Sequence, residues 1–148
     1  MNSIGYRYLE HCTDSIIEAY GSSLEELFQN CAKGLVNIMF DISKVEPRKA
    51  FTIKAEGDEL ETLLYDWLEK VLLKILIDQI IPSRYMLEIY TKNDETNEKR
   101  YHVNAHVGGE TVNYDKHNYK IEIKAVTYHN LKIYFKNNQY TATFLADL

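Results

Sequence analysis

The sequence predicts an α+β fold in which two amphipathic helices pack on one side of a mostly antiparallel β-sheet. Two stretches carry apolar residues at helical spacing, and several others alternate apolar with polar residues at a period of two. The alternating stretches flank the helical ones without a regular strand-helix-strand order, and four of them run consecutively at the C-terminal end. That order is typical of α+β proteins rather than of parallel α/β folds.

Both predicted helices show a start signal and an apolar face. In residues 22–40, Ser23 is followed three residues later by a glutamate, which is the spacing of a capping box. In residues 57–78, Asp58 can cap the helix. A wide apolar stripe that includes Trp67 indicates that one face of this second helix is deeply buried.

The strands are predicted from apolar residues at alternate positions. These residues are Phe51, Ile53 and Ala55; Tyr85, Leu87 and Ile89; Tyr101, Val103, Ala105 and Val107; Ile121, Ile123 and Ala125; and Leu131, Ile133 and Phe135. Asn137 and Asn138 separate the last two apolar runs, and asparagine tolerates the positive φ of a tight turn, so we expect a hairpin there. The charge-rich stretch 92–100 predicts a mobile loop, and the pair Gly108 and Gly109 favours a turn.

Length and charge limit the possible functions. The length of 148 residues fits a single domain, residues 1–148, with a core of its own. A formal net charge of -5 argues against a protein that grips a phosphate backbone by itself, so we expect any RNA contact to be indirect. The N-terminus lacks the pattern of a signal peptide, and the longest apolar run is too short to cross a bilayer, so we expect no membrane association. Cys12 and Cys31 form no CxxC motif, which fits a reducing cytoplasm.

Two histidine patterns have the spacing of familiar sites but do not predict one. His102 and His106 have the spacing that chelates zinc on a helix, yet their stretch alternates like a strand. Four residues of strand span roughly 13 Å, too far for two ligands of one ion. The neighbours His11 and Cys12 point to opposite faces of an extended segment, which argues against a thiol nucleophile activated by a base.

Three aspartates stand at the ends of predicted elements. They are Asp14, Asp41 and the penultimate residue Asp147, which is followed by the carboxylate of Leu148. A hard cation such as calcium or magnesium could collect oxygen ligands from these separate segments. Aspartates also cap helices, form turns and solvate chain ends without any metal. The residue pattern by itself leaves both interpretations open.

Several stretches resemble, in order along the chain, segments of the archease family. They are YRYLEHCTDSIIEAYGSSLEELF near the N-terminus, FDISKVEPR after the first helix, LYDWLEKVL in the second helix, and EIKAVTYHNL and LADL towards the C-terminus. The matches spread over essentially the whole chain. One departure is that Cys12 and Thr13 precede Asp14, where the family typically has Thr-Ala.

The resemblance implies an accessory protein of the tRNA-splicing RNA ligase and not an enzyme in its own right. Archease promotes guanylylation of the ligase's active-site histidine, for which the ligase uses GTP, and so allows multiple turnover. The family binds a divalent metal ion, for which calcium, manganese and magnesium are the candidates. The resemblance implies a metal site at Asp14, Asp41, Asp147 and Leu148, and a functional contact at Lys124 of the K-A-V-T-Y-H motif. His129, the other polar residue of this motif, is a further candidate contact, with the alternative that it only ends the strand before a turn at Asn130.

Two other functions stay open. A chaperone-like modulator of an RNA-modifying enzyme, a methyltransferase, is an idea also attached to the archease family, and it would act through exposed apolar surface rather than carboxylates. A small metal-dependent hydrolase would hold its ion with the three aspartates and use His129 as the base, but no recognisable nucleophile or substrate motif accompanies them.

Overall fold

The computed structural model describes residues 4–9 and 14–148. These described residues form two helices, a short 3-10 helix and seven strands. In order they are β1 (Tyr6–Leu9), β2 (Asp14–Gly21), α1 (Leu24–Met39), η1 (Ile42–Lys44), β3 (Lys49–Gly57), α2 (Leu60–Leu76), β4 (Ile80–Asn93), β5 (Lys99–Thr111), β6 (Ala125–Lys136) and β7 (Gln139–Asp147).

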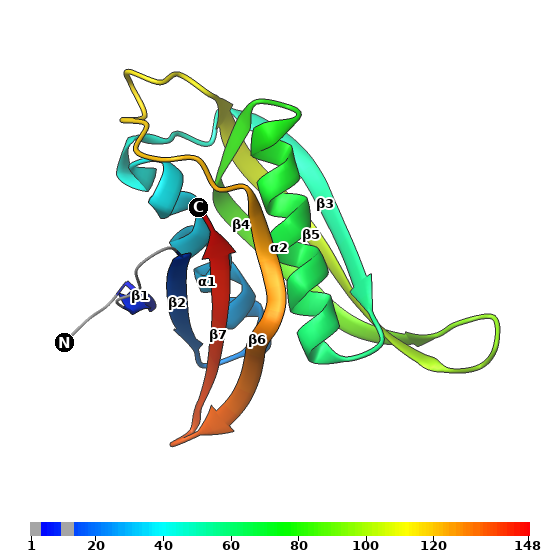
Figure 1. Ribbon diagram of the computed structural model, residues 1–148. Coiled ribbons are helices and arrows are strands. Elements are labelled where there is room, and N and C mark those ends of the chain that lie inside the picture. Colours follow the sequence, from blue (N-terminus) through cyan, green and yellow to red (C-terminus); the bar gives the residue numbers. More distant parts are fainter. Residues whose placement is uncertain (1–3, 10–13) are drawn as a thin grey trace.

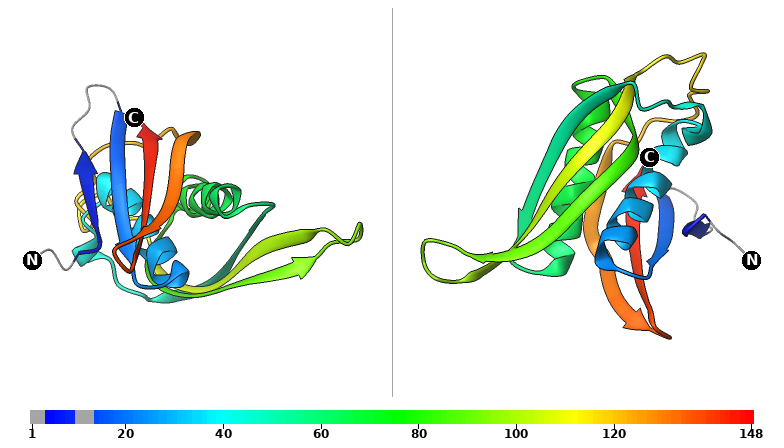
Figure 2. Two further views of the ribbon diagram at one scale, coloured as in Figure 1. Left: turned by 90° about the horizontal axis from the view of Figure 1, so that it is seen from below. Right: turned by 180° about the vertical axis from the view of Figure 1, so that it is seen from behind.

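The strands divide between two antiparallel sheets. One sheet has the order β1-β2-β7-β6 and the other β3-β5-β4 (Figure 1). Both helices contact strands of both sheets, and the view from below in Figure 2 shows α1 and α2 between the two sheets. The predicted α+β class is confirmed. Each sheet therefore turns one face towards the helices, which close the core between them.

Helix α1 begins as the sequence predicts. Ser23 is its N-cap, and its Oγ accepts a hydrogen bond of 3.1 Å from the backbone N–H of Glu26. The N-cap of α2 is Glu59, one residue beyond the predicted Asp58. The Glu59 N–H donates to Thr62 Oγ1, and this hydroxyl donates in turn to Asp58 Oδ1. Asp58 thus supports the helix start through Thr62.

Trp67 connects α2 to the rest of the core. Its side chain is fully buried, as predicted, and its Nε1–H donates a 3.0 Å hydrogen bond to the carbonyl oxygen of Phe28 in α1. The indole also packs edge-to-face against Tyr85 of β4. One side chain therefore joins both helices and one sheet, which is why the apolar stripe of α2 has to face inward.

The β4–β5 and β6–β7 hairpins differ in how well the sequence predicts them. Asn137 and Asn138 have φ angles of 53° and 61° and form the turn between β6 and β7, as predicted. The strands β4 and β5 extend into the charged stretch 92–100, so the predicted loop shortens to a turn at residues 94–98. The carboxylate of Asp94 accepts the backbone N–H of Thr96 and of Glu98, which stabilises this turn.

Two local predictions are wrong. Gly108 and Gly109 do not form a turn but lie inside β5, where the register with β4 shifts between Pro82 and Arg84. A Cβ at Gly109 would stand 2.4 Å from the carbonyl oxygen of Ile81, so glycine permits this close approach of the two backbones. The strand predicted from residue 121 begins only at Ala125.

None of the helices in residues 4–9 and 14–148 is long and apolar enough to cross a membrane.

Candidate functional site

The start of β2 and the end of β7 lie side by side at one end of the β1-β2-β7-β6 sheet. Asp14, the first residue of β2, lies directly opposite Asp147, the last residue of β7. On the other side of β7, Asp147 lies opposite Ala125 of β6. The backbone register thus brings together two of the four predicted metal ligands, Asp14 and Asp147, although they are separated by almost the whole sequence.

The backbone of Lys124 lies next to these two aspartates, and we call Asp14, Asp147 and Lys124 the aspartate row. Its N–H donates a hydrogen bond of 2.8 Å to the carbonyl oxygen of Asp147, one residue before β6 begins. The side chain of Lys124 is exposed, and it has no ion-pair partner among the described residues. Leu148 follows Asp147 and packs partly against the core. The backbone of Lys124 and the chain end therefore adjoin the paired aspartate positions, and the side chain of Lys124 is exposed.

Asp41 follows α1 and caps the short helix η1. Its Oδ1 accepts the backbone N–H and the hydroxyl of Ser43, at 3.0 Å and 2.6 Å. These hydrogen bonds, together with the positive charges of Lys120 and Lys44, hold the pKa of Asp41 below its usual value. The pKa of Tyr6 in β1 is raised, mainly by burial and also by the charge of Asp41. The charge of Asp41 therefore acts on Tyr6 of β1 as well as on the residues of its own turn.

The donor chemistry of these positions fits a hard cation, which takes carboxylate and carbonyl oxygens. Among the side chains that the structure describes, which do not include that of Asp14, no group of three or more His, Cys, Asp or Glu residues could hold a metal ion. The ligand set of Asp14, Asp41, Asp147 and Leu148 stays a prediction. The register places Asp14 opposite Asp147. In contrast, Oδ1 of Asp41 already accepts hydrogen bonds from Ser43.

His129 lies apart from the aspartate row. The register of β6 against β7 shifts between Thr127 and Lys132, and the exposed His129 falls in this irregular segment, next to Asn130 with a φ of 61°. Tyr128 in the same segment packs edge-to-face against Tyr65 of α2. Because His129 lies well along β6 from Asp147, the structure does not place it as a base for a reaction at the carboxylates.

A polar cluster that the sequence did not predict surrounds the buried His117 in the connection between β5 and β6. His117 is fully buried, and its Nε2 lies 2.9 Å from Oε1 of Glu110, while its Nδ1 accepts the N–H of Asn113. Lys116 donates to Glu110 and to Glu46 at 2.7 Å and 2.6 Å. The hydrogen bond from Lys116 is the main reason why the pKa of Glu110 falls to about 2. The cluster fixes a segment that shows no periodic pattern, so the only signal in the sequence is a histidine that follows the charged residues Asp115 and Lys116.

This cluster holds the connection between β5 and β6 against the end of α1. The carbonyl oxygen of His117 accepts the backbone N–H of Asp41, and the N–H of Lys120 donates to the carbonyl oxygen of Met39. The Nζ of Lys120 also donates to the carbonyl oxygen of Asn37. The connection leads directly to Lys124, so these bonds position both Asp41 and Lys124 relative to the helix.

Comparison with known proteins decides the family. The family model described as the archease protein family (MTH1598/TM1083) matches residues 6–148. The chain belongs to the archease family. The protein archease of Sulfurisphaera tokodaii is 36% identical over 143 residues, which are 97% of this chain and 98% of that protein. The protein archease of Thermococcus gammatolerans is 35% identical over 144 residues, with the same coverage of both chains.

Solved structures agree with the family. The solution structure of Methanobacterium thermoautotrophicum protein 1598 matches with a TM-score of 0.79 and 26% identity, covering 98% of this chain and 99% of that chain. The crystal structure of a Thermotoga maritima protein described as an archease and possible chaperone matches with a TM-score of 0.55 and 22% identity, covering 95% and 94%. This second likeness shows the shared fold alone.

Proposed function

We propose that this protein is a cytoplasmic accessory factor that activates the GTP-dependent tRNA-splicing RNA ligase. It promotes guanylylation of the ligase's active-site histidine and thereby allows multiple turnover, and it catalyses no reaction itself. Membership of the archease family supports this proposal. The single observation that carries it is the hydrogen bond that holds Lys124 beside Asp147, in the row where Asp147 pairs with Asp14.

The side chains of this row have complementary tasks. The exposed ammonium of Lys124 contacts a phosphate of GTP or a carboxylate of the ligase. Asp14, Asp147 and the carboxylate of Leu148, with Asp41, would hold a divalent cation, either calcium or one of manganese and magnesium. Such an ion, when bound, supplies positive charge next to phosphate oxygens. The protein thus orders charged groups near the ligase's nucleophile, which lowers the cost of bringing GTP and the histidine together.

The net charge of the chain fits a protein partner rather than RNA. A formal charge of -5 complements a basic, RNA-binding groove on a ligase, and complementary potentials speed encounter. The same negative charge disfavours direct binding of the protein to the phosphate backbone of RNA. Contact with RNA is therefore indirect and follows from docking on the ligase.

A second candidate is a chaperone-like modulator of an RNA-modifying enzyme such as a methyltransferase. The description of the Thermotoga maritima protein as a possible chaperone favours it. It would use exposed apolar side chains, of which Met86 and Ile77 are each 71% exposed and Phe135 is 56% exposed. Met86 lies in β4, Ile77 follows α2 directly and Phe135 lies in β6. These side chains therefore come from separate elements and do not include Asp14, Lys124 or Asp147.

The test is a ligation assay under multiple-turnover conditions with the cognate ligase and GTP. The proposal predicts that ligase alone stops after about one product per enzyme and that catalytic amounts of this protein restore turnover. If the protein only protects the ligase from unfolding, it will raise the yield of ligated product by the same factor with a ligase that has been guanylylated beforehand and is limited to one turnover. That result would favour the chaperone-like function.

A further inference from the structure

The β1-β2-β7-β6 sheet turns one face towards the helices and an outer face away from them. Figure 1 shows β2 and β7 in front of α1, and the rear view in Figure 2 shows α1 in front of them. Ile17 of β2 and Phe144 and Ala146 of β7 are fully buried on the helix side. Their neighbours Ile16 and Leu145 lie on the outer face, because successive side chains of a strand alternate between its two faces.

Three aliphatic side chains form a row across this outer face. The register places Leu9 of β1 opposite Ile16 of β2, and Ile16 opposite Leu145 of β7. All three are only half-buried. A hollow of about 340 Å³ lies at this row, and Asn130 and Lys132 of β6 also line it. The outer face thus carries an apolar depression with room for a side chain of another molecule.

The irregular segment of β6 forms one wall of the hollow. Thr127 lies opposite Leu145 and Lys132 opposite Thr143, so five steps along β6 match two steps along β7. The extra residues cannot pair with β7 and leave the ladder as a bulge. Asn130 has a φ of 61° in this bulge, a conformation that asparagine tolerates better than most residues.

Lys132 is an unpaired cation at the hollow. Among the described residues that line the hollow, it alone carries a charge, and it is exposed and has no ion-pair partner. The register places Lys132 in one cross-strand row with Thr143, Glu18 and Arg7, and Arg7 and Glu18 already pair with each other at 2.7 Å. The group that complements this rim is therefore a carboxylate beside an apolar side chain.

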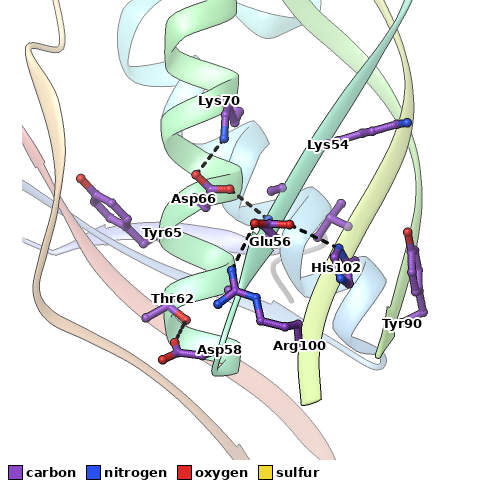
Figure 3. Close-up of a pocket in the computed structure, with 13 residues that line it drawn as sticks. Lys54, Glu56, Asp58, Thr62, Tyr65, Asp66, Lys70, Tyr90, Arg100 and His102 are labelled. Atoms are coloured by element: carbon purple, nitrogen blue, oxygen red, sulfur yellow. Dashed lines mark hydrogen bonds and ion pairs between the residues drawn. The ribbon is translucent and has the colours of Figure 1, made fainter. Parts of the chain in front are cut away.

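A larger hollow, of about 690 Å³, lies beside α2 and differs in its charges. Figure 3 shows that its charged side chains point towards one another: Glu56 pairs with Arg100 at 3.2 Å and Asp66 with Lys70 at 2.9 Å. Because these charges already satisfy one another, that hollow does not favour a charged occupant.

The apolar hollow adjoins the aspartate row. Asp147 stands two residues beyond Leu145 on β7 and so shares its face of the sheet. Two residues of strand span roughly 7 Å, whereas a protein interface of ordinary size covers about 800 Å² of each partner. A protein that docks on Asp147 therefore covers the hollow as well.

We propose that the hollow over Leu9, Ile16 and Leu145 receives an apolar side chain of the partner ligase, and that a neighbouring carboxylate of the ligase pairs with Lys132. This inference rests on the proposed function, which brings the ligase to the aspartate row, and it adds the docking surface. Burial of the apolar row stabilises the complex, whereas the guanylylation step depends on Lys124. The hollow thus determines how tightly the ligase binds and not how fast the bound ligase reacts.

A second copy of this chain is a poorer occupant. Isologous pairing of two such hollows would bring two Lys132 side chains together, and neither hollow has a carboxylate in its lining to offset them. The ligase remains the occupant that the position next to Asp147 favours.

The first experiment titrates the cognate ligase with this protein. It measures the concentration that gives half-maximal guanylylation and the rate at saturation. Leu145→Ser should raise the half-maximal concentration by at least about tenfold and leave the saturating rate unchanged. The matched control Met86→Ser, at an exposed side chain of the other sheet, should change neither quantity. Thermal unfolding checks that both variants are folded.

Lys132→Glu tests the same site at an exposed position, where the fold tolerates substitution. It should raise the half-maximal concentration by at least about fivefold, because it places a carboxylate against the carboxylate of the ligase. Lys92→Glu, at an exposed lysine of β4, makes the same charge change in the other sheet and should behave like the parent.

Methyl NMR detects docking without any reaction. Unlabelled ligase, added without GTP, should shift or broaden the methyl signals of Leu9, Ile16 and Leu145, while Ile77 at the end of α2 should be unaffected. If these signals respond but the parent does not stimulate guanylylation, the docking site stands and the proposed function fails.

The reverse result separates the two claims in the other direction. If the parent stimulates guanylylation while Leu145→Ser and Lys132→Glu keep the half-maximal concentration of the parent, the docking site is overturned and the proposed function stands. The docking site is also overturned if the ligase does not bind the parent. A dimer in sedimentation whose contact shields the methyl groups of Ile16 and Leu145 overturns it too, because a second copy then fills the hollow.

Discussion

The backbone N–H of Lys124 donates a 2.8 Å hydrogen bond to the carbonyl oxygen of Asp147. Asp147 is in turn paired with Asp14 on the neighbouring strand. Three residues from the motifs shared with the archease family therefore stand in one row, although they come from the beginning, the last fifth and the end of the chain. Only the backbone of Lys124 takes part in the fold here, so its exposed side chain is available for a partner.

Lys124→Ala should leave stability unchanged within about 0.5 kcal/mol, because alanine keeps the N–H that bonds to Asp147 and the side chain is exposed. If Lys124 contacts GTP or the ligase, stimulation of guanylylation should fall strongly. Thermal unfolding followed by circular dichroism and the guanylylation rate give the two readouts. Lys136→Ala, at an exposed lysine next to the hairpin turn, is the control. A Lys124 variant that stimulates like the parent would remove the lysine from the proposed mechanism.

Asp147→Asn should weaken binding of calcium and manganese, because it removes one negative charge while keeping the shape of the side chain. A cation at about 100 times its Kd stabilises the parent by about 2.7 kcal/mol, and much of this gain should vanish in the variant. Titration calorimetry and melting with and without metal measure both effects. Asp115→Asn, at an exposed aspartate in the β5–β6 connection, should behave like the parent. Unchanged affinity in Asp147→Asn would show that Asp147 is no metal ligand.

Trp67→Ala should destabilise the protein by about 3 to 5 kcal/mol, because it leaves a cavity between both helices and β4. Trp67→Phe should cost less, since it keeps most of the packing and loses mainly the hydrogen bond to Phe28. Urea unfolding curves of the two variants measure the difference. A stability of Trp67→Ala equal to that of the parent would contradict the packing of α2 described here.

Stability should fall as the pH drops through the titration range of Glu110. Its pKa in the folded protein is about 2, compared with an ordinary value of 4.5, mainly because Lys116 donates a hydrogen bond to it. A lowered carboxyl pKa stabilises the fold fully above the ordinary value, and this contribution is lost as the pH falls from about 4.5 to about 2. Glu110→Gln should therefore be less stable than the parent at neutral pH and lose less stability on acidification.

Urea unfolding at several pH values between neutral and about 2 measures this difference. Glu95→Gln, at an exposed glutamate in the β4–β5 turn without an ion pair among the described residues, should follow the parent. Parallel pH curves for Glu110→Gln and the parent would show that the cluster around His117 contributes no pH-dependent stability.

Local features of the fold could be predicted because their causes lie within a few residues. The cap at Ser23, the burial of Trp67 and the turn at Asn137 and Asn138 all follow from spacing or backbone preference, and the structure confirms them. The division of the strands into two sheets could not be predicted, because it depends on which distant strands pair. The turn predicted at Gly109 is wrong for a similar reason, because this glycine permits the close approach of Ile81 from another strand.

Prediction of the candidate site from the sequence is limited in the same way. Residue type and position single out Asp14, Asp41 and Asp147, but periodicity could not show that β2 and β7 are neighbours. Nor could it show that Lys124 precedes its strand and bonds to Asp147. His129 belongs to the same sequence motif as Lys124, but it lies in the irregular segment of β6, several residues along the strand from Ala125 opposite Asp147.

The most direct test of the proposed function is the rate at which the cognate ligase becomes guanylylated. Transfer of labelled GMP from GTP to the ligase should be followed after one round of ligation, with and without this protein, and with the Lys124→Ala and Lys136→Ala variants. The proposal predicts that the parent and Lys136→Ala restore rapid labelling in the presence of divalent metal, while Lys124→Ala does not. Labelling that is equally slow with and without a saturating amount of the folded parent protein would contradict it.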